Sequence, residues 1–191
     1  MSPALSTLRL AALLATLTLA GCGTLTGTRY APLISNTLAL REAQLARVSV
    51  GSIAADPDAK DDVERVFARA MKVNSVYGSY TAYLREALAS EFDHADLLDP
   101  ASAVRIDGVL LRNELGSESG RENVIVEARL TVTRDGVAVY SGQKTGTLAW
   151  GSVYPGEVAI PRAISNYQAG VQRLIAAFIA DPAFVAALKP R

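Results

Sequence analysis

The stretch 123-NVIVEARLTVTRDGVAVYSG-142 holds the strongest structural signal in the chain. From Val124 to Val132, apolar and polar side chains alternate with the two-residue period of a strand that buries one face. The pair Asp135–Gly136 then separates two apolar runs, and both residue types tolerate positive φ, which a two-residue hairpin turn requires. We therefore predict an antiparallel hairpin in which residues 137–150 form the return strand.

Two further strands are predicted upstream of this hairpin. Val104 and Ile106 alternate with charged residues, and 47-RVSVGSI-53 shows the same period. The polar stretch 113-NELGSESGREN-123 is predicted to be a loop or a wide hairpin.

Two segments have the period of amphipathic helices. Residues 79–98 place apolar side chains at steps of three and four, namely Tyr80, Tyr83, Leu84, Ala87, Leu88 and Phe92. A second helix is predicted to begin at Pro161, which suits a first helical turn, and to end before Asp181, with one more turn in residues 183–188. Residues 62–72 are predicted to have weak helical character.

The predicted order of elements is therefore β-α-β-β-β-α. Two helices on one face of a mostly antiparallel four-stranded sheet make a two-layer sandwich of the α+β class. We assign residues 46–191 to this single domain and residues 22–45 to a tether, whose second half can contain one or two helical turns.

The N-terminus has the pattern of a secretory signal peptide, which we assign to residues 1–21. Arg9 precedes the apolar run Leu10–Ala20, which is shorter than the roughly 20 residues that span a bilayer. The chain's single cysteine, Cys22, follows directly.

Leu19, Ala20, Gly21 and Cys22 resemble the lipobox of bacterial lipoproteins. The resemblance implies cleavage after Gly21, a diacylglycerol thioether on Cys22 and N-acylation of the new terminus. Several acyl chains hold a protein firmly on a membrane. Gly23, where this family carries Asp for inner-membrane retention, implies an outer-membrane anchor facing the periplasm. The alternatives are a buried lone cysteine and a plain signal peptide with a chance cysteine.

Composition excludes several other classes. Cleavage would remove Arg9 and no acid, so the mature chain would carry 18 basic and 19 acidic residues. This balance gives no electrostatic footprint for nucleic acid. With Cys22 acylated no thiol is left for a disulfide, and we predict no cofactor and no metal site. No oligomeric state is predicted.

Residues that could support catalysis do not form a recognisable group, so we predict no catalytic residue. His94, the only histidine, lies near a predicted helix C-terminus, where a structural role is favoured. Glu118 and Glu122 are a carboxylate pair of unspecific spacing. The acidic run at residues 56–62 departs from the calcium-binding EF-hand loop, because Asp61 replaces the required glycine.

Trp150 and Tyr154 are the candidate partner-binding residues. They stand among glycines and a proline between the last strand and the last helix, and aromatic side chains dominate interface hot spots. The alternative is that Trp150 caps the core at the sheet edge. Tyr77, Tyr80 and Tyr83 have helical spacing, for which core packing is the default.

The element order of residues 46–180 resembles two groups of periplasmic lipoproteins, namely the lipopolysaccharide-assembly lipoprotein and the auxiliary lipoproteins of ABC-type envelope lipid transporters. This resemblance rests on fold alone and carries no binding residue. It implies a non-enzymatic accessory or binding subunit of a cell-envelope system, attached to the membrane by its lipid, with an envelope protein or a lipid as its partner. The alternatives are a structural or stress-related lipoprotein that self-associates or contacts peptidoglycan, and an envelope hydrolase.

Overall fold

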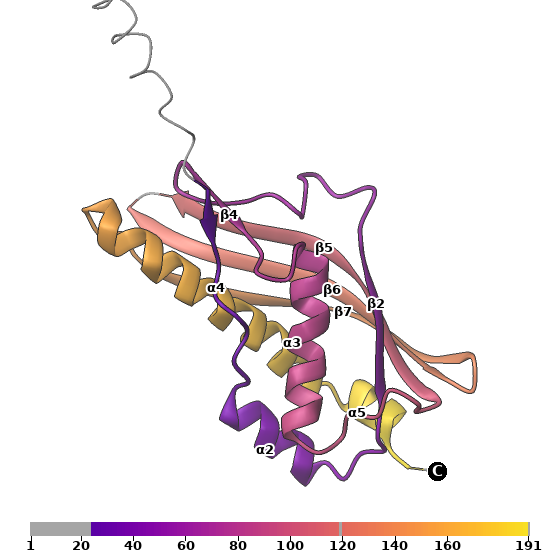
Figure 1. The fold of residues 1–191 in the computed structure, drawn as a ribbon. Coiled ribbons are helices and arrows are strands. Elements are labelled where there is room, and N and C mark those ends of the chain that lie inside the picture. The colour runs from indigo at the N-terminus through magenta and orange to yellow at the C-terminus, as the bar shows by residue number, and fades with distance from the viewer. Residues whose placement is uncertain (1–23, 119, 191) are drawn as a thin grey trace, which may run out of the picture.

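A four-stranded sheet forms one layer of the protein. The computed structural model describes residues 24–118 and 120–190. The sheet has the order β2 (Ser49–Ala55), β5 (Val104–Glu118), β6 (Arg121–Arg134) and β7 (Val137–Gly151). Strand β2 is parallel to β5, and the other two pairs are antiparallel (Figure 1). The four-stranded sheet agrees with the prediction, but the described residues form a second sheet and four helices where one sheet and two helices were predicted.

The β6–β7 hairpin forms as predicted. Asp135 and Gly136 have φ values of 51° and 79°, the left-handed conformation that a two-residue turn needs. Val124, Val126 and Val132 are buried, as the alternation along β6 requires.

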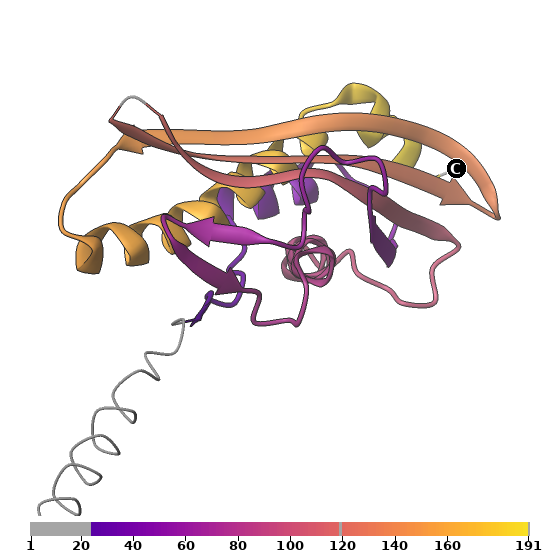
Figure 2. The same cartoon turned by 90° about the horizontal axis from the view of Figure 1, so that it is seen from above.

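The helices cover one face of this sheet, as the two views in Figures 1 and 2 show. Helix α3 (Tyr80–His94) packs beside β2, and α4 (Gly156–Ile179) packs against β6 and β7. Two shorter helices, α2 (Ile34–Glu42) and α5 (Pro182–Leu188), flank them. The first turn of α3 is capped by the Ser79 hydroxyl, which accepts from the Ala82 N–H at 3.0 Å.

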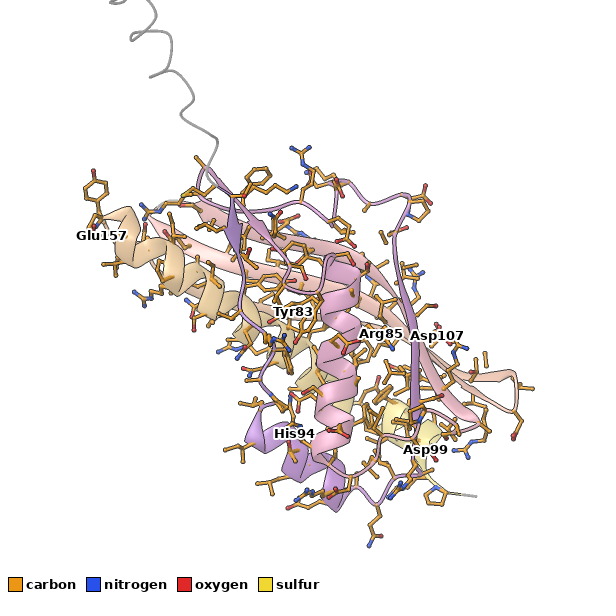
Figure 3. All side chains as sticks on the ribbon, in the orientation of Figure 1. Tyr83, Arg85, His94, Asp99, Asp107 and Glu157 are labelled. Carbon is orange, nitrogen blue, oxygen red and sulfur yellow. The ribbon has the colours of Figure 1, made fainter. Side chains whose placement is uncertain are left out.

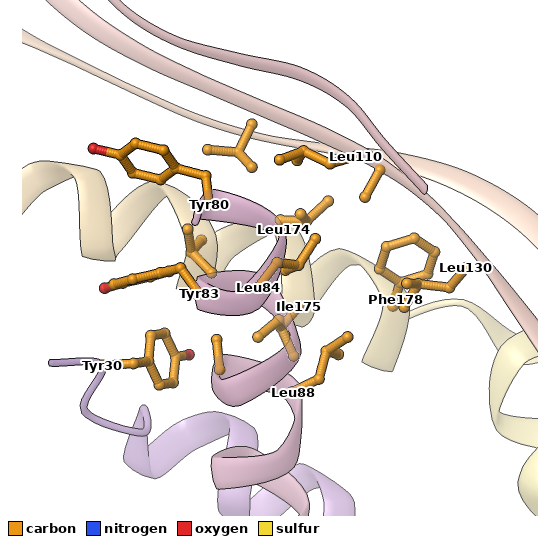
Figure 4. Close-up of a cluster of buried hydrophobic side chains, with 14 of the residues drawn as sticks. Tyr30, Tyr80, Tyr83, Leu84, Leu88, Leu110, Leu130, Leu174, Ile175 and Phe178 are labelled. Atoms are coloured by element: carbon orange, nitrogen blue, oxygen red, sulfur yellow. The ribbon is translucent and has the colours of Figure 1, made fainter. Parts of the chain in front are cut away.

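The core lies between the sheet and the helices. All six stripe residues predicted for residues 79–98 are buried, and Figure 4 shows Tyr80, Tyr83, Leu84 and Leu88 against Leu174, Ile175 and Phe178 of α4. Helix α4 approaches the sheet closely where Gly146 of β7 faces Gly170. A Cβ built on Gly146 would lie 2.2 Å from the Gly170 carbonyl oxygen, so only glycine fits there.

A second, three-stranded sheet was not predicted. Its order is β1 (Leu25–Thr26), β4 (Met71–Asn74) and β3 (Val66–Ala68). The helical prediction for residues 62–72 is wrong, because β3 and the first half of β4 lie in this segment and pair as a tight hairpin. Its short strands turn at Arg69 and Ala70, with Val66 paired to Val73.

The segment assigned to a tether packs on the domain from Leu25 onward. Tyr30, Asn36 and Leu40 are buried. The Tyr30 hydroxyl donates to the buried Glu91 carboxylate at 2.5 Å, and the Asn36 amide donates to the same oxygen at 3.0 Å. The folded unit therefore begins earlier than residue 46.

Two boundaries also differ from the predictions. The polar stretch 113–123 is mostly strand, because β5 continues to Glu118 and β6 resumes at Arg121. Helix α4 begins at Gly156, so Pro161 lies inside it rather than at its start. Five helical residues precede this proline, so the one intrahelical bond lost is that to the Glu157 carbonyl, close to the start of the helix.

No single helix among the described residues is both long and apolar enough to cross a membrane. Helices α4 and α5 meet that length and hydropathy criterion as a pair, with a bend of 74° between them.

Candidate binding site

A small cavity opens at one end of the sheet, between β3, the ends of β5, β6 and β7, and the first turns of α4. Its volume is about 150 Å³. We call it the Trp150 pocket, and it is lined by Phe67, Ala68, Arg69, Leu115, Gly116, Ser117, Glu122, Trp150, Ala159, Ile160 and Ala163. Most of these side chains are apolar. An engineered apolar cavity of similar size holds benzene, so the Trp150 pocket can hold a ring or a short alkyl segment.

Glu122 is the polar centre of the pocket wall. It faces Trp150 across the β6–β7 pair, and the indole N–H donates to its Oε2 at 2.8 Å. Arg69 donates from Nε and Nη2 to Oε1 at 3.2 and 3.0 Å. The Ser152 hydroxyl donates to the same oxygen at 3.2 Å. Both carboxylate oxygens are therefore satisfied.

These donors keep Glu122 ionised. Burial raises the pKa of the Glu122 carboxyl, but the hydrogen bonds from Arg69, Trp150 and Ser152 outweigh burial and hold that pKa below its usual value. The Glu122 carboxylate accepts hydrogen bonds from Arg69, Trp150 and Ser152, so its role is to hold the pocket wall in place.

Arg69 connects the β3–β4 hairpin to the segment that follows β7. Its guanidinium also donates to the Val153 carbonyl, next to Tyr154. Arg69 itself has a positive φ of 57°, which costs a non-glycine residue about 1–2 kcal/mol. The hydrogen bonds to Glu122 and Val153 offset this backbone strain and hold the rim of the pocket.

The sequence does contain a signal for the burial of Glu122, which the predictions above do not include. The alternation of β6 extends backwards from Val124, so Glu122 occupies a core-facing position of that strand. A charged residue at such a position requires a partner. No local pattern pointed to Arg69, which reaches Glu122 across 53 positions of sequence.

The structure separates the two predicted aromatic residues. Trp150 is 7% exposed and belongs to the core, whereas Tyr154 is 94% exposed. Trp150 therefore reaches a ligand only through the pocket that it lines. Tyr154 stands at the surface just before α4.

Cys22, the predicted lipidation site, lies outside the described residues. His94 is the last residue of α3, and Figure 3 shows it far from Glu157 at the tip of α4. In the acidic run, Asp56 and Asp62 accept backbone N–H bonds from Asp58 and Glu64, as turn residues do. Within residues 24–118 and 120–190, no group of three potential ligands is placed to hold a metal ion.

The tyrosines of the first predicted helical segment belong to a packed cluster. Tyr83 makes edge contacts with Tyr30, Tyr77 and Tyr167, at centroid distances of 6.1, 5.7 and 5.4 Å. Tyr80 and Tyr83 are buried, and the Tyr80 hydroxyl donates to the Val73 carbonyl at 2.8 Å. This cluster stabilises the contact between α3, α4 and the N-terminal segment.

No family model matches the chain, and no curated protein matches its sequence. Among solved structures, it is similar to protein XCC0632 from Xanthomonas campestris, described as DUF330. The TM-score is 0.53 at 14% identity, over 82% of this chain and 95% of the other. This likeness shows a shared fold.

Two weaker likenesses are to proteins described as lipoproteins. The first is a "putative lipoprotein" from Caulobacter crescentus, with a TM-score of 0.42 at 15% identity, over 80% of this chain and 96% of that one. The second is a minor lipoprotein from Acinetobacter baumannii, with a TM-score of 0.33 at 9% identity, over 70% and 93%. At these scores the likenesses carry no argument about function.

Proposed function

We propose that this protein is a membrane-anchored lipoprotein of the bacterial cell envelope that binds an acyl chain of a lipid in the Trp150 pocket, without catalysing a reaction. It acts as an accessory or binding subunit in lipid transport or outer-membrane assembly. The anchor is Cys22, and Gly23 directs the protein to the periplasmic face of the outer membrane.

The observation that carries this proposal is the chemistry of the pocket. Leu115, Ile160 and Trp150 present apolar surface, and the charged groups of Glu122 and Arg69 are bound to each other. A site of this kind favours an apolar guest over a polar substrate, because transfer of alkyl groups from water supplies the binding free energy. The volume of about 150 Å³ admits a few methylenes, so the pocket takes one segment of a chain.

The enzyme alternative has less support. A general acid or base is a titratable side chain near the reacting atoms, most often a histidine or a carboxylic acid. The Glu122 carboxylate accepts bonds from three side chains, and His94 lies at the C-terminal end of α3. Neither group supports a catalytic role for the pocket, and its apolar lining favours binding.

Trp150 gives a direct test, since it is the only tryptophan in the chain. A soluble chain beginning at Gly23 is titrated with lysophosphatidylglycerol below its micelle concentration, and the fluorescence of Trp150 is recorded. We expect a saturable change in intensity or wavelength. The headgroup alone, glycerophosphoglycerol, should produce none.

A matched pair of variants localises the effect. Ala163→Leu puts a larger side chain into the pocket and so fills part of it. Ala169→Leu makes the same change on α4 outside the pocket lining. The first should abolish the saturable change and the second should keep it, provided that both unfold cooperatively. Absence of any saturable change in the unaltered chain would refute acyl-chain binding.

A further inference from the structure

Three exposed apolar side chains lie on the segments that form or adjoin the Trp150 pocket. Tyr154 is 94% exposed, Val158 on the first turn of α4 is 52% exposed, and Phe67 of β3 is 37% exposed. We call these three residues the rim patch. Isolated exposed apolar residues need no explanation, whereas a contiguous exposed apolar patch marks an interaction surface.

The described chain begins at this same end. Leu25 pairs with Val73 of β4, which in turn pairs with Val66 of β3, next to Phe67. Neighbouring strands lie about 4.8 Å apart, so Leu25 is about 10 Å from Val66. Figures 1 and 2 both show the indigo strand β1 in the half of the molecule that holds the tip of α4, away from the β6–β7 hairpin.

The length of chain between the anchor and the domain therefore limits which end of the domain can face the bilayer. Leu25 is three positions after Cys22, with two residues between them, and a fully extended chain spans at most about 3.6 Å per residue. Three such steps cover at most about 11 Å, so an acylated Cys22 is held within that distance of β1. A tether of this length does not let the domain turn its other end to the bilayer.

From this constraint we propose that the rim patch rests on the bilayer surface that holds the anchor, so that the Trp150 pocket opens toward the lipid headgroups. This inference rests on the proposed lipidation of Cys22. The occupant is the bilayer itself, because the anchor brings the patch to that surface.

The charges at this end suit an interfacial position. The Arg65 guanidinium lies 5.6 Å from the centre of the Phe67 ring, and Lys72 is paired with Phe67 across the β3–β4 hairpin. Basic side chains around apolar ones are typical of surfaces that meet anionic headgroups. Asp61, Asp62 and Glu114 line a cavity together with Arg65 and Phe67. These acids and Glu157 at the tip of α4 (Figure 3) oppose this attraction, so the apolar side chains and the anchor supply most of the binding.

The test uses two exposed valines as matched labelling sites. The chain has one cysteine, which acylation occupies, so V158C or V139C provides the only free thiol. Val139 is 42% exposed and lies near the β6–β7 turn, at the opposite end. Each lipidated full-length variant carries an environment-sensitive fluorophore and is reconstituted in vesicles of phosphatidylethanolamine and phosphatidylglycerol.

Two quenchers then report what covers each site. We expect lipid-borne spin labels near the headgroups to quench the label at position 158 several-fold more than the label at 139, and aqueous iodide to show the reverse order. Equal lipid quenching at both sites, or none at 158, would overturn the proposal. Protection at 158 from both quenchers would also overturn it and assign the patch to a protein partner or a second copy.

The anchor is checked separately on the same samples. Mass spectrometry of each variant shows whether Cys22 is acylated. An acylated protein with an unquenched label at 158 contradicts only the orientation, whereas a protein without acyl groups contradicts the proposed function itself.

Discussion

The indole N–H of Trp150 donates to Oε2 of Glu122 at 2.8 Å, across a directly opposed pair of residues on β6 and β7. This bond joins the only tryptophan of the chain to a buried carboxylate at the pocket wall. Because Arg69 binds the other oxygen of Glu122, one carboxylate holds the sheet, the β3–β4 hairpin and the pocket together.

Removal of the charge of Glu122 should destabilise the protein. In Glu122→Gln the shape is kept, but Arg69 loses its ionic partner and one donor is left poorly satisfied, at a cost of about 1–3 kcal/mol. Urea unfolding measures this difference. Glu86→Gln, which alters an exposed pair with Arg85, is the control and should change stability by less than about 0.5 kcal/mol. Equal effects of the two substitutions would contradict the structural role of Glu122.

The same carboxylate predicts a pH dependence. The pKa of Glu122 in the folded protein lies below its unfolded value of about 4.3. A lowered folded pKa adds stability above the unfolded pKa, and this stability is lost as the pH falls through the folded pKa. The stability difference between the unaltered chain and Glu122→Gln should therefore be constant near neutrality and shrink below about pH 4.

Other carboxylates do not disturb this comparison. The hydrogen bond from Arg112 lowers the pKa of Glu114, and the hydrogen bond from Lys144 lowers that of Asp181 to about 2. Both groups are present in both proteins, so their contributions cancel in the difference. A difference that grows as the solution becomes more acidic would show that the sign assigned to Glu122 is wrong.

Gly146 should tolerate no side chain. Gly146→Ala places a methyl group 2.2 Å from the Gly170 carbonyl oxygen, so α4 must move away from β7, at a cost of about 1–3 kcal/mol or more. Gly151→Ala is the control in the same strand, since a Cβ there meets nothing within 4 Å. Thermal unfolding of both variants measures the contrast, and equal midpoints would refute the close approach.

The two aromatic residues at this end should respond differently to truncation. Trp150→Ala removes a side chain that is 7% exposed, and we expect a loss of about 3–5 kcal/mol. Tyr154→Ala removes an exposed ring and should change stability by less than about 0.5 kcal/mol. The denaturant midpoints of the two variants measure this difference. A Trp150→Ala protein with nearly unchanged stability would contradict the burial of Trp150.

Local patterns predicted the parts of the fold that repeat over many residues. The alternation of β6 and the stripe of α3 each span enough positions to reveal a period, and the Asp135–Gly136 turn is marked by its residue types. The β3–β4 hairpin was missed because its strands are very short and its turn contains Arg69 and Ala70 in place of glycine or asparagine.

The candidate site could be predicted only in part. Trp150 was singled out for its residue type, but its burial depends on Glu122 and Arg69, which come from distant segments. The N-terminal segment was predicted to be a tether because its packing likewise depends on distant residues. Tyr30 and Asn36 are ordered by Glu91, which lies more than fifty positions away. Such contacts leave no local period in the sequence.

The central claim, that Cys22 anchors this protein in a membrane, is tested most directly by the intact mass of the protein extracted from bacterial envelopes with detergent. We predict a chain that begins at Cys22 and carries a diacylglycerol thioether and an N-linked acyl group, and we predict that Cys22→Ser yields neither the cleavage nor the lipid. A mature protein that begins at another residue, or that begins at Cys22 without any lipid, would contradict the account.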